Sequence, residues 1–480
     1  MHQALPCDGY AEALGLLLER IDYERSTSLG YGEREFKLDR MRELLARLGH
    51  PERRLPTVHI TGTKGKGSTA AMVAAMLTAA GYRTGLFSSP HLECIEERLA
   101  IDGQPCPAER FVQLIERLRP TVEAMDEAAR RAGPPEMGPT YFELTTALAW
   151  MHFTDRQANG DKAVDAVVLE VGMGGRLDST NVCHPAVTAI TSISFDHTKQ
   201  LGNTLAAIAG EKAGIIKPGV PVVSGVTGDE ARDVIRRVSR EHDAPLVELG
   251  VDFDFRYFPP RDLQHQRALP RIDYRERTGQ RHSQFSGVDL GLLGRHQAAN
   301  AAVALAIVGR LVESGWAISE SVMRQGLAAV RLPARVELLS QQPAVIVDGA
   351  HNVASVSALL ATLDESFRVA GRKVLIFATT KDKDARGMLE LLVPRFDQVI
   401  VTRYESNPRG VPVDELIAVA QEVGARDVQS VATPGDAWEL VSRRSGSDGL
   451  ICVTGSFFTA AEMRRAILEP TRNSLNPVTS

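Results

Sequence analysis

The chain has 480 residues, which is too many for one ordinary hydrophobic core and predicts two or three domains. Its hydrophobic content of 44% and charged content of 24% are typical of globular proteins, and a net charge of −5 excludes a general attraction to nucleic acid or anionic membranes. Five cysteines without a C-x-x-C pair and no apolar run of about 18 residues argue against a disulfide framework, a zinc site and a membrane span, and favour a cytoplasmic protein.

In the first half of the chain, short β-branched runs alternate with longer helical patterns. Strands are expected at Thr57–Thr61, Thr84–Ser88, Ala166–Val171, Val187–Thr191 and Val220–Ser224, and helices at Thr69–Ala80, Ala108–Ala129 and Thr140–Phe153. This alternation favours right-handed βαβ units and a mainly parallel sheet. The polar segment 252–286 lacks long apolar runs, and we expect a small antiparallel hairpin set there, at the edge of the first domain.

Two helical patterns, Leu293–Val312 and Ile318–Val330, precede a second α/β series. Its strands are expected at Ala344–Val347, Lys373–Phe377, Gln398–Thr402 and Leu450–Thr454. Because Leu332-Pro333 interrupts the helical pattern, we place the domain boundary there. The predicted fold is α/β, with a P-loop-type, mainly parallel sheet domain at 1–330 and a smaller Rossmann-like α/β domain at 331–480.

The first strand runs into the Gly-rich turn Gly62-Thr63-Lys64-Gly65-Lys66-Gly67-Ser68, and a helix follows. Such a turn brings backbone N–H groups and a helix N-terminus to phosphate oxygens, with a lysine as counter-charge and a hydroxyl for Mg²⁺. The strict Walker pattern is not met, because Gly67 separates Lys66 from Ser68. The alternative is an ordinary turn between strand and helix.

Polar side chains also follow later strands, where α/β sheets bind ligands. The run Leu169–Asn181 is a strand followed by a Gly-rich polar loop. His197 is a candidate metal ligand, base or cap, and Lys212 is either a solvated helical charge or a residue that converges with His197. Glu143 either complements a helix dipole or holds Mg²⁺.

The second series contains a similar strand exit, Asp348-Gly349-Ala350-His351-Asn352, and Leu332–Arg335 lies shortly before it. An arginine can stabilise developing phosphoryl charge, and an aspartate can bind ribose hydroxyls. These residues are therefore candidates for a nucleotide site.

Taken together, these motifs resemble the Mur-ligase-type ATP-dependent amide ligases, and most closely the folylpolyglutamate synthases and their bifunctional forms with dihydrofolate synthase. The resemblance covers roughly residues 10–465. It rests on the phosphate loop and on further motifs in the same order, namely Ser88–Leu92, Tyr141–Glu143, Leu169–Asn181, Asp196–Thr198, Glu211–Lys217, Gly294–Asn300, Leu332–Arg335, Asp348–Asn352 and Val453–Ser456.

The resemblance implies roles for individual residues. The ATP-binding residues it implies are Gly62, Thr63, Gly65, Lys66, Gly67, Ser68, Asn300, Arg335, Asp348 and His351, with Arg335 on the phosphates and Asp348 on the ribose. The implied Mg²⁺ ligands are Ser68, Ser89, Glu143, His197 and a Lys212 carbamylated by CO₂. The implied catalytic residues are Lys66, His197, Lys212 and Arg335.

The implied reaction belongs to folate metabolism. ATP converts a carboxylate into an acyl phosphate, and the amine of L-glutamate then attacks it, with a folate and also dihydropteroate as acceptors. The implied partners are these small molecules, without nucleic acid or membrane, and the implied state is a monomer. The alternatives are a Mur-type ligase for another carboxylate and an ATP-binding phosphotransferase or regulatory module.

Three positions depart from the family pattern. Lys64 stands where an Asn is usual, which alters the charge of the phosphate loop, and Ala334 replaces a common Gly before Arg335. The stretch Phe36–Met41 matches only in part the family's L-G-L-E-R stretch, which helps to bind the pteroate. The dihydrofolate synthase reaction is therefore less firmly implied than polyglutamylation.

Overall fold

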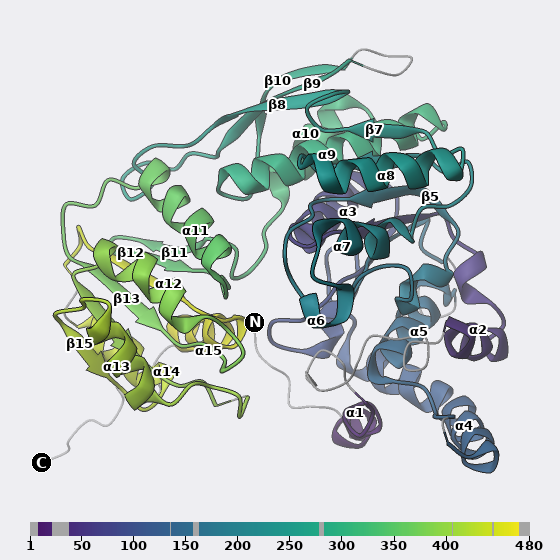
Figure 1. Cartoon of the computed structure of the whole chain (residues 1–480), viewed down its shortest axis with the longest axis horizontal. Helices are drawn as coiled ribbons and strands as arrows, with labels where there is room; N and C mark the ends of the chain where they lie inside the picture. The colour runs from purple at the N-terminus through teal and green to yellow at the C-terminus, as the bar shows by residue number, and fades with distance from the viewer. Residues whose placement is uncertain are drawn as a thin grey trace, which may run out of the picture. The chain divides into compact units, whose positions relative to one another are not determined.

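The computed structural model describes residues 8–21, 38–134, 136–156, 163–277, 283–405, 407–443 and 446–469. The chain forms two compact units, and Figure 1 draws the elements of both. Unit 1 comprises residues 1–256, 273–288 and 299–330, and unit 2 comprises residues 257–272, 289–298 and 331–480. Among the described residues, no helix is long and apolar enough to cross a membrane.

Unit 1 contains a seven-stranded sheet of order β3-β2-β4-β1-β5-β6-β7. Its strands are β1 (Thr57–Thr61), β2 (Thr84–Phe87), β3 (Leu99–Ile101), β4 (Ala166–Glu170), β5 (Pro185–Ile190), β6 (Val222–Ser224) and β7 (Leu246–Glu248). Every neighbouring pair is parallel except β2 and β3. The mainly parallel sheet is thus confirmed, and its two short strands β3 and β7 were not foreseen.

Two helices of unit 1 precede its sheet in the chain, and the others follow strands. They are α1 (Tyr10–Leu18), α2 (Leu38–Arg47), α3 (Lys66–Ala79), α4 (Ala108–Ala132), α5 (Tyr141–Thr154), α6 (Thr198–Leu201), α7 (Leu205–Ala213), α8 (Asp229–Glu241) and α10 (Glu320–Ala329). Helix α10 packs on α3, and a Cβ atom added to Gly326 would lie 2.6 Å from the Cα of Met76. A glycine is therefore needed at this helix crossing.

The segment 252–286 contributes to a separate three-stranded sheet of order β10-β9-β8. Its strands are β8 (Phe253–Phe258), β9 (Arg271–Glu276) and β10 (Gln284–Asp289). Residues 257–272 and 289–298 belong to unit 2, so that the chain passes between the units more than once. A single cut in the sequence cannot express this arrangement. Helix α9 (Arg295–Glu313) follows β10.

Unit 2 contains a six-stranded sheet of order β11-β12-β16-β13-β14-β15. Its strands are β11 (Glu337–Gln341), β12 (Ala344–Val347), β13 (Lys373–Phe377), β14 (Gln398–Val401), β15 (Val428–Ser430) and β16 (Leu450–Thr454). Only β11 is antiparallel to its neighbour. Its helices are α11 (Val353–Ser366), α12 (Ala385–Leu392), α13 (Val413–Glu422), α14 (Pro434–Ser442) and α15 (Phe457–Leu468), and they lie beside the sheet in Figure 1.

Candidate active site

The Gly-rich loop after β1 forms a cradle at the N-terminus of α3. The helix begins earlier than the expected Thr69, so that Lys66, Gly67 and Ser68 form its first turn. The N–H groups of a first helical turn have no partner within the helix, and the helix dipole adds positive potential there. Gly65 precedes the helix with a φ of 85°, in the left-handed region that favours glycine. The cradle is thus suited to an anion such as a phosphate.

Two other segments approach this loop so closely that a side chain would clash at Gly65 and be crowded at Gly67. A Cβ atom on Gly65 would lie 2.2 Å from Oδ1 of Asn300, at the start of α9's second turn. A Cβ atom on Gly67 would lie 3.1 Å from Oε2 of Glu170, the last residue of β4. The structure therefore brings Asn300, a predicted site residue, and Glu170 to the phosphate loop.

A third segment, the loop after β5, is hydrogen-bonded to the phosphate loop. The N–H of Thr63 donates to the carbonyl of Ser192 at 2.8 Å, and the N–H of Lys64 donates to the Ser192 hydroxyl at 3.0 Å. Lys64 Nζ forms an ion pair with Oδ2 of Asp196 at 2.7 Å. The charge that Lys64 adds to the loop is thus compensated by Asp196.

His197 lies at the exposed end of the same loop. Its backbone N–H donates to Oδ1 of Asp196 at 3.0 Å, and its φ of 49° lies in the left-handed region. Its side chain is 53% exposed, and its Nε2 is 3.9 Å from that oxygen. Through Asp196 and Lys64, His197 is therefore linked to the phosphate loop.

Lys212 reaches the phosphate loop from α7. Its side chain is buried, and its Nζ donates to the carbonyl of Gly62 at 3.0 Å. Burial, together with the nearby cation of Lys66, lowers the pKa of Lys212 to about 7. Burial also lowers the pKa of Lys66, although the carboxylate of Glu170 opposes that shift. The structure thus brings two catalytic candidates, Lys66 and Lys212, to the same loop.

Glu170 is a site residue that sequence reasoning missed. Its carboxylate is buried, and its Oε2 accepts the N–H of Ser89, a predicted metal ligand, at 3.1 Å. An acid at the end of a fully buried strand, immediately before a Gly-rich loop, is the signal that could have identified it.

Glu143 lies in a different environment from the other predicted metal ligands. It caps α5, where its Oε2 accepts the N–H of Thr140 at 2.8 Å and the Thr140 hydroxyl at 3.0 Å. Both carboxylate oxygens also accept from Nε of the buried Arg40, at 2.8 and 3.0 Å. The recorded bonds of Glu143 therefore go to a helix cap and a buried ion pair, and not to the phosphate loop.

The polar residues of the Leu169–Asn181 run mostly shape the loop itself. His59 Nε2 lies 2.9 Å from the Thr180 hydroxyl, which in turn donates to Oδ1 of Asp178 at 2.5 Å. Because the Thr180 hydroxyl already donates its proton to Asp178, His59 Nε2 must donate to the Thr180 oxygen. Burial lowers the pKa of His59 to about 3, so its ring is neutral at neutral pH. Lys217 Nζ donates to Oδ1 of Asn181 at 2.8 Å. These side chains fix the loop from within.

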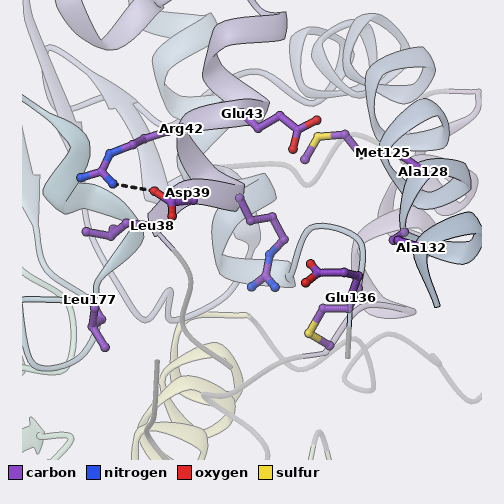
Figure 2. A pocket seen from close by; sticks show the side chains of 12 residues that line it. Leu38, Asp39, Arg42, Glu43, Met125, Ala128, Ala132, Glu136 and Leu177 are labelled. Atoms are coloured by element: carbon purple, nitrogen blue, oxygen red, sulfur yellow. Dashed lines mark hydrogen bonds and ion pairs between the residues drawn. The ribbon is translucent and has the colours of Figure 1, made fainter. Parts of the chain in front are cut away.

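A cavity of about 650 Å³ opens in unit 1 between α2, α4 and the loop after β4. Figure 2 shows acidic Glu43 and Glu136 and apolar Met125 and Leu177 around it. The other lining residues are Leu38, Asp39, Arg40, Arg42, Ala128, Ala129, Ala132 and Met137. Leu38–Arg40 belong to the stretch that partly matches the pteroate-binding motif, whereas Phe36 and Lys37 lie outside the described residues.

In unit 2, Arg335 lies between β12's carboxyl end and α15. Its guanidinium carbon is 4.5 Å from the ring centroid of Phe457, which in turn lies 5.8 Å from the ring centroid of His351. Asp348 is buried, and its Oδ2 accepts the N–H of Val336 at 2.8 Å. Burial raises the pKa of Asp348, and Arg335 opposes that shift. The three predicted residues of unit 2 thus form one cluster.

The strand exits of β13 and β14 provide a second polar surface in unit 2. The hydroxyl groups of Thr379, Thr402 and Tyr404 are buried, and the described residues offer them no hydrogen-bond partner. The N–H of Lys381 donates to the carbonyl of Arg409 at 3.0 Å, which joins the two loops. Buried hydroxyls without a described partner therefore gather at this edge of the sheet, beside loops that contain Lys381 and Arg409.

Comparison with known proteins identifies the family. The Mur ligase middle domain model matches residues 142–308, and the model of the Mur ligase, glutamate ligase domain matches residues 334–457. The chain is 35% identical to dihydrofolate synthase/folylpolyglutamate synthase of Bacillus subtilis, over 90% of this chain and 94% of that protein. It is 32% identical to folylpolyglutamate synthase of Lacticaseibacillus casei, over 89% of this chain and 94% of that protein.

A solved structure supports the same relationship. Folylpolyglutamate synthase of Mycobacterium tuberculosis, complexed with ADP and AMPPCP, superposes with a TM-score of 0.81 at 33% identity, over 96% of this chain and 99% of that chain. The predicted α/β fold and the resemblance are confirmed, and the chain is an ATP-dependent ligase that forms amide bonds. It belongs to the folylpolyglutamate synthase family of Mur ligases.

Proposed function

We propose that this chain adds L-glutamate to a folate, as a tetrahydrofolylpolyglutamate synthase, and also adds it to dihydropteroate, as a dihydrofolate synthase. The relatives bear both kinds of name, one bifunctional and one folylpolyglutamate synthase alone. The observation that carries the proposal is the meeting of Lys66, Lys212 and Glu170 at one phosphate cradle. Simple nucleotide binding does not require a second, buried lysine there.

The state of Lys212 supports its proposed carbamylation. A lysine attacks CO₂ only as the neutral amine, and a pKa of about 7 makes that form abundant near neutral pH. The ammonium group first releases one proton, and the neutral amine nitrogen then bonds to the CO₂ carbon and releases a second proton, so that a cation becomes an anionic carbamate. An anion at this position is compatible with a magnesium site, where a second ammonium group would repel the metal.

Mg²⁺ is the proposed metal. It prefers oxygen ligands, and the Ser89 hydroxyl and the nearby carboxylate of Glu170 supply such oxygens. Ser68, Ser89, His197 and carbamylated Lys212 remain the proposed ligands. For the carboxylate ligand, the contacts favour Glu170 over Glu143, because Glu170 faces the phosphate loop and both oxygens of Glu143 are engaged by Arg40. When bound, the metal supplies charge neutralisation and orientation of the phosphates.

The cavity of unit 1 is the proposed acceptor site. Its apolar walls suit the ring systems of a folate, and Leu38–Arg40 lie in the stretch that matches the pteroate motif. One wall is Leu177, from the loop that follows Glu170. The acceptor would therefore lie on the segment that also contacts the phosphate loop.

In unit 2, Arg335, Asp348 and His351 are proposed to serve the nucleotide, together with Asn300 of unit 1. The cations and unpartnered hydroxyls at the exits of β13 and β14 are proposed to hold the two carboxylates of glutamate. The division into an ATP-binding part at residues 1–330 and a glutamate ligase part at residues 331–480 stays a prediction.

The proposed reaction has two steps. A carboxylate oxygen of the acceptor attacks the γ-phosphorus of ATP, the bond to the β-phosphate oxygen breaks, and ADP leaves an acyl phosphate. Lys66 and Arg335 stabilise the charge that spreads over the transferred group. The glutamate amine then attacks the carbonyl carbon, loses a proton and expels inorganic phosphate, which leaves the amide.

ADP release by the purified protein tests this function. The protein receives ATP, Mg²⁺ and L-glutamate with dihydropteroate, with tetrahydrofolate or with no acceptor. Release that requires glutamate and occurs with both acceptors supports the bifunctional enzyme, and release with tetrahydrofolate alone restricts it to polyglutamylation. No release with either acceptor would contradict the proposal and favour another carboxylate. Monomeric state and cytoplasmic location stay predictions.

A further inference from the structure

Lys64 places a second lysine on the phosphate loop, two residues before Lys66. The family resemblance assigns it no role, since an asparagine is usual at this position. Its Nζ lies 2.7 Å from Oδ2 of Asp196, and the two side chains are 38% and 26% exposed. The structure thus holds an additional cation at a phosphate cradle, on a partner that is itself within reach of water.

The backbone of Lys64 is fixed by the loop after β5. Its N–H donates to the Ser192 hydroxyl at 3.0 Å, and its carbonyl accepts from the hydroxyl groups of Thr191 at 2.6 Å and Ser192 at 2.9 Å. The Thr63 hydroxyl donates to the carbonyl of Ser194 at 3.2 Å and accepts its N–H at 3.1 Å. The lysine side chain therefore starts from a fixed point, and its own torsions decide where its ammonium group lies.

The charge of Lys64 reaches the centre of the phosphate site. Burial is the main cause of the lowered pKa values of Lys66 and Lys212, and the cation of Lys64 acts in the same direction on both. The carboxylate of Asp196 acts in the opposite direction on both. Because Coulombic effects decline with distance, the ammonium of Lys64 lies within electrostatic reach of both lysines. A phosphate beside Lys66 would therefore also attract Lys64.

The ion pair between Lys64 and Asp196 is weak enough to exchange. A pair of partly exposed side chains shifts an equilibrium by about fivefold or less, because water screens the charges and the lysine loses rotamer freedom. A carboxylate carries one negative charge, whereas a terminal phosphate carries about 1.5 to 2 near neutral pH. In a strand–loop–helix cradle, backbone N–H groups hold the inner phosphates and a lysine side chain reaches the outer ones. The terminal phosphate of ATP is therefore a stronger partner for Lys64 than Asp196 is.

We propose that Lys64 exchanges Asp196 for the γ-phosphate of ATP, and thereby lets the site distinguish ATP from ADP. The inference rests on the proposed function, because it takes from it that this loop binds the phosphates of ATP. Asp196 is partly exposed, so water can solvate its carboxylate once the lysine has left.

Binding measurements with Mg²⁺ test the exchange without ligase turnover. Isothermal titration calorimetry compares the ATP analogue AMPPCP, which has a γ-phosphate, with ADP, which has none. Lys64→Gln should weaken AMPPCP binding by about 10-fold or more, as expected for a lost hydrogen bond between charged groups, and ADP binding by no more than about twofold. Lys64→Arg keeps the charge and should retain most of the discrimination.

Arg237→Gln is the matched control, because it removes another exposed cation from an ion pair, with Glu241 of α8. It should leave both affinities unchanged. Retained ADP binding shows that Lys64→Gln is folded, and Lys64→Met replaces it if that variant does not fold. Equal losses for AMPPCP and ADP, or wild-type affinity for AMPPCP, would overturn the inference.

A double-variant cycle separates exchange from a permanent ion pair. If Lys64 leaves Asp196 for the phosphate, Asp196→Asn removes the competing partner. Lys64→Gln should then weaken AMPPCP binding more in the Asp196→Asn background than in the wild type, by up to about fivefold. The cycle cancels any direct effect of Asp196 on the metal or the nucleotide. An equal effect, or none, in that background would mean that no exchange occurs and would overturn the inference.

The ligase assay stands apart from this test. If ADP release never depends on glutamate and the loss specific to AMPPCP is still observed, the proposed function fails and the exchange stands. If ADP release depends on glutamate and that loss is absent, the exchange fails alone.

Discussion

The phosphate loop of unit 1 and the backbone arch of unit 2, which is residues 334–336, both contain positive φ values but use them for opposite purposes. In the loop, Gly62 and Gly65 have positive φ values, which lets bare backbone approach a ligand. In the arch, Ala334 and Val336 have positive φ values without a glycine, at a cost of about 1–3 kcal/mol each. The loop thus exposes backbone groups, whereas the arch carries one functional side chain, that of Arg335.

The two regions also differ in how their charge responds to conditions. Lys66 and Lys212 are lysines whose pKa values are lowered by burial, so that their charge depends on the environment. Arg335 keeps its charge at any working pH, and with burial it helps to lower the pKa of neighbouring His296 to about 4. The charge of the loop is therefore adjustable, and that of the arch is constant.

The largest effect is expected from the loop. Lys66→Ala should lower kcat by about 10²–10³-fold, because it removes the cation that neutralises the transferred phosphoryl group. Steady-state ADP release measures this, with Lys373→Ala at the start of β13 as the control. Turnover like that of the wild type would remove Lys66 from the reaction.

Lys212→Ala should fold yet lose about 10²-fold or more in turnover, since no carbamate can form. A short carboxylic acid added to the assay should restore part of the activity, because it supplies the missing anion. Full activity of Lys212→Ala without added acid would contradict this role. So would mass spectra of the intact wild-type protein and its peptides that never show carbamylation of Lys212.

The lowered pKa of Lys212 predicts that turnover depends on pH. The folded-state pKa of about 7 lies below the ordinary lysine value of 10.5, so the fraction of neutral amine increases as the pH rises through about 7. At fixed dissolved CO₂, turnover should therefore rise across this range. The unfolded chain keeps its proton up to the higher pKa, so this group's contribution to stability also rises between the two values. A flat activity profile would argue against carbamylation.

A smaller effect separates the two candidate carboxylates. Glu170→Gln should raise the Mg²⁺ concentration needed for half-maximal turnover by about 10-fold or more. Glu143→Gln should instead lower the melting temperature, because it weakens a buried ion pair with Arg40, and leave the Mg²⁺ requirement near wild type. The reverse pattern would restore Glu143 as the metal ligand.

The last prediction compares one backbone substitution in the arch, which should have the smallest effect, with one in the phosphate loop. Ala334→Gly supplies the residue that a left-handed φ favours, and should leave turnover within about twofold of wild type. Gly65→Ala should raise the KM for ATP by about 10-fold or more, because its Cβ would displace Asn300. Equal effects of the two substitutions would remove the distinction between loop and arch.

Much of this architecture could be predicted from local patterns. The strands β1, β12, β13 and β16 have the expected bounds, because each is a short run rich in β-branched or apolar residues between clear breaks. The short strands β3 and β7 were missed, since three residues carry too little periodicity. The division of segment 252–286 between two units depends on long-range contacts, which no local pattern contains.

The candidate site divides in the same way. Lys66, Lys212 and Asn300 could be brought together from motifs, and the structure places them at one loop. The environments of Glu143 and Glu170 could not be distinguished from the sequence, because each is an acid near the end of a predicted helix or strand. Only their partners differ, since Glu143 pairs with Arg40 and Glu170 lies against the phosphate loop. The partner of Asp348 is likewise a backbone N–H, which a sequence does not show.

The most direct test of the central claim follows oxygen atoms from the acceptor. A folate whose reacting carboxylate carries ¹⁸O is turned over with ATP and L-glutamate, and the inorganic phosphate is analysed by mass spectrometry. An acyl phosphate predicts one ¹⁸O atom in each phosphate released, because the attacking carboxylate oxygen leaves with phosphorus. Phosphate without the label, from an enzyme that still forms the amide, would contradict the proposed mechanism.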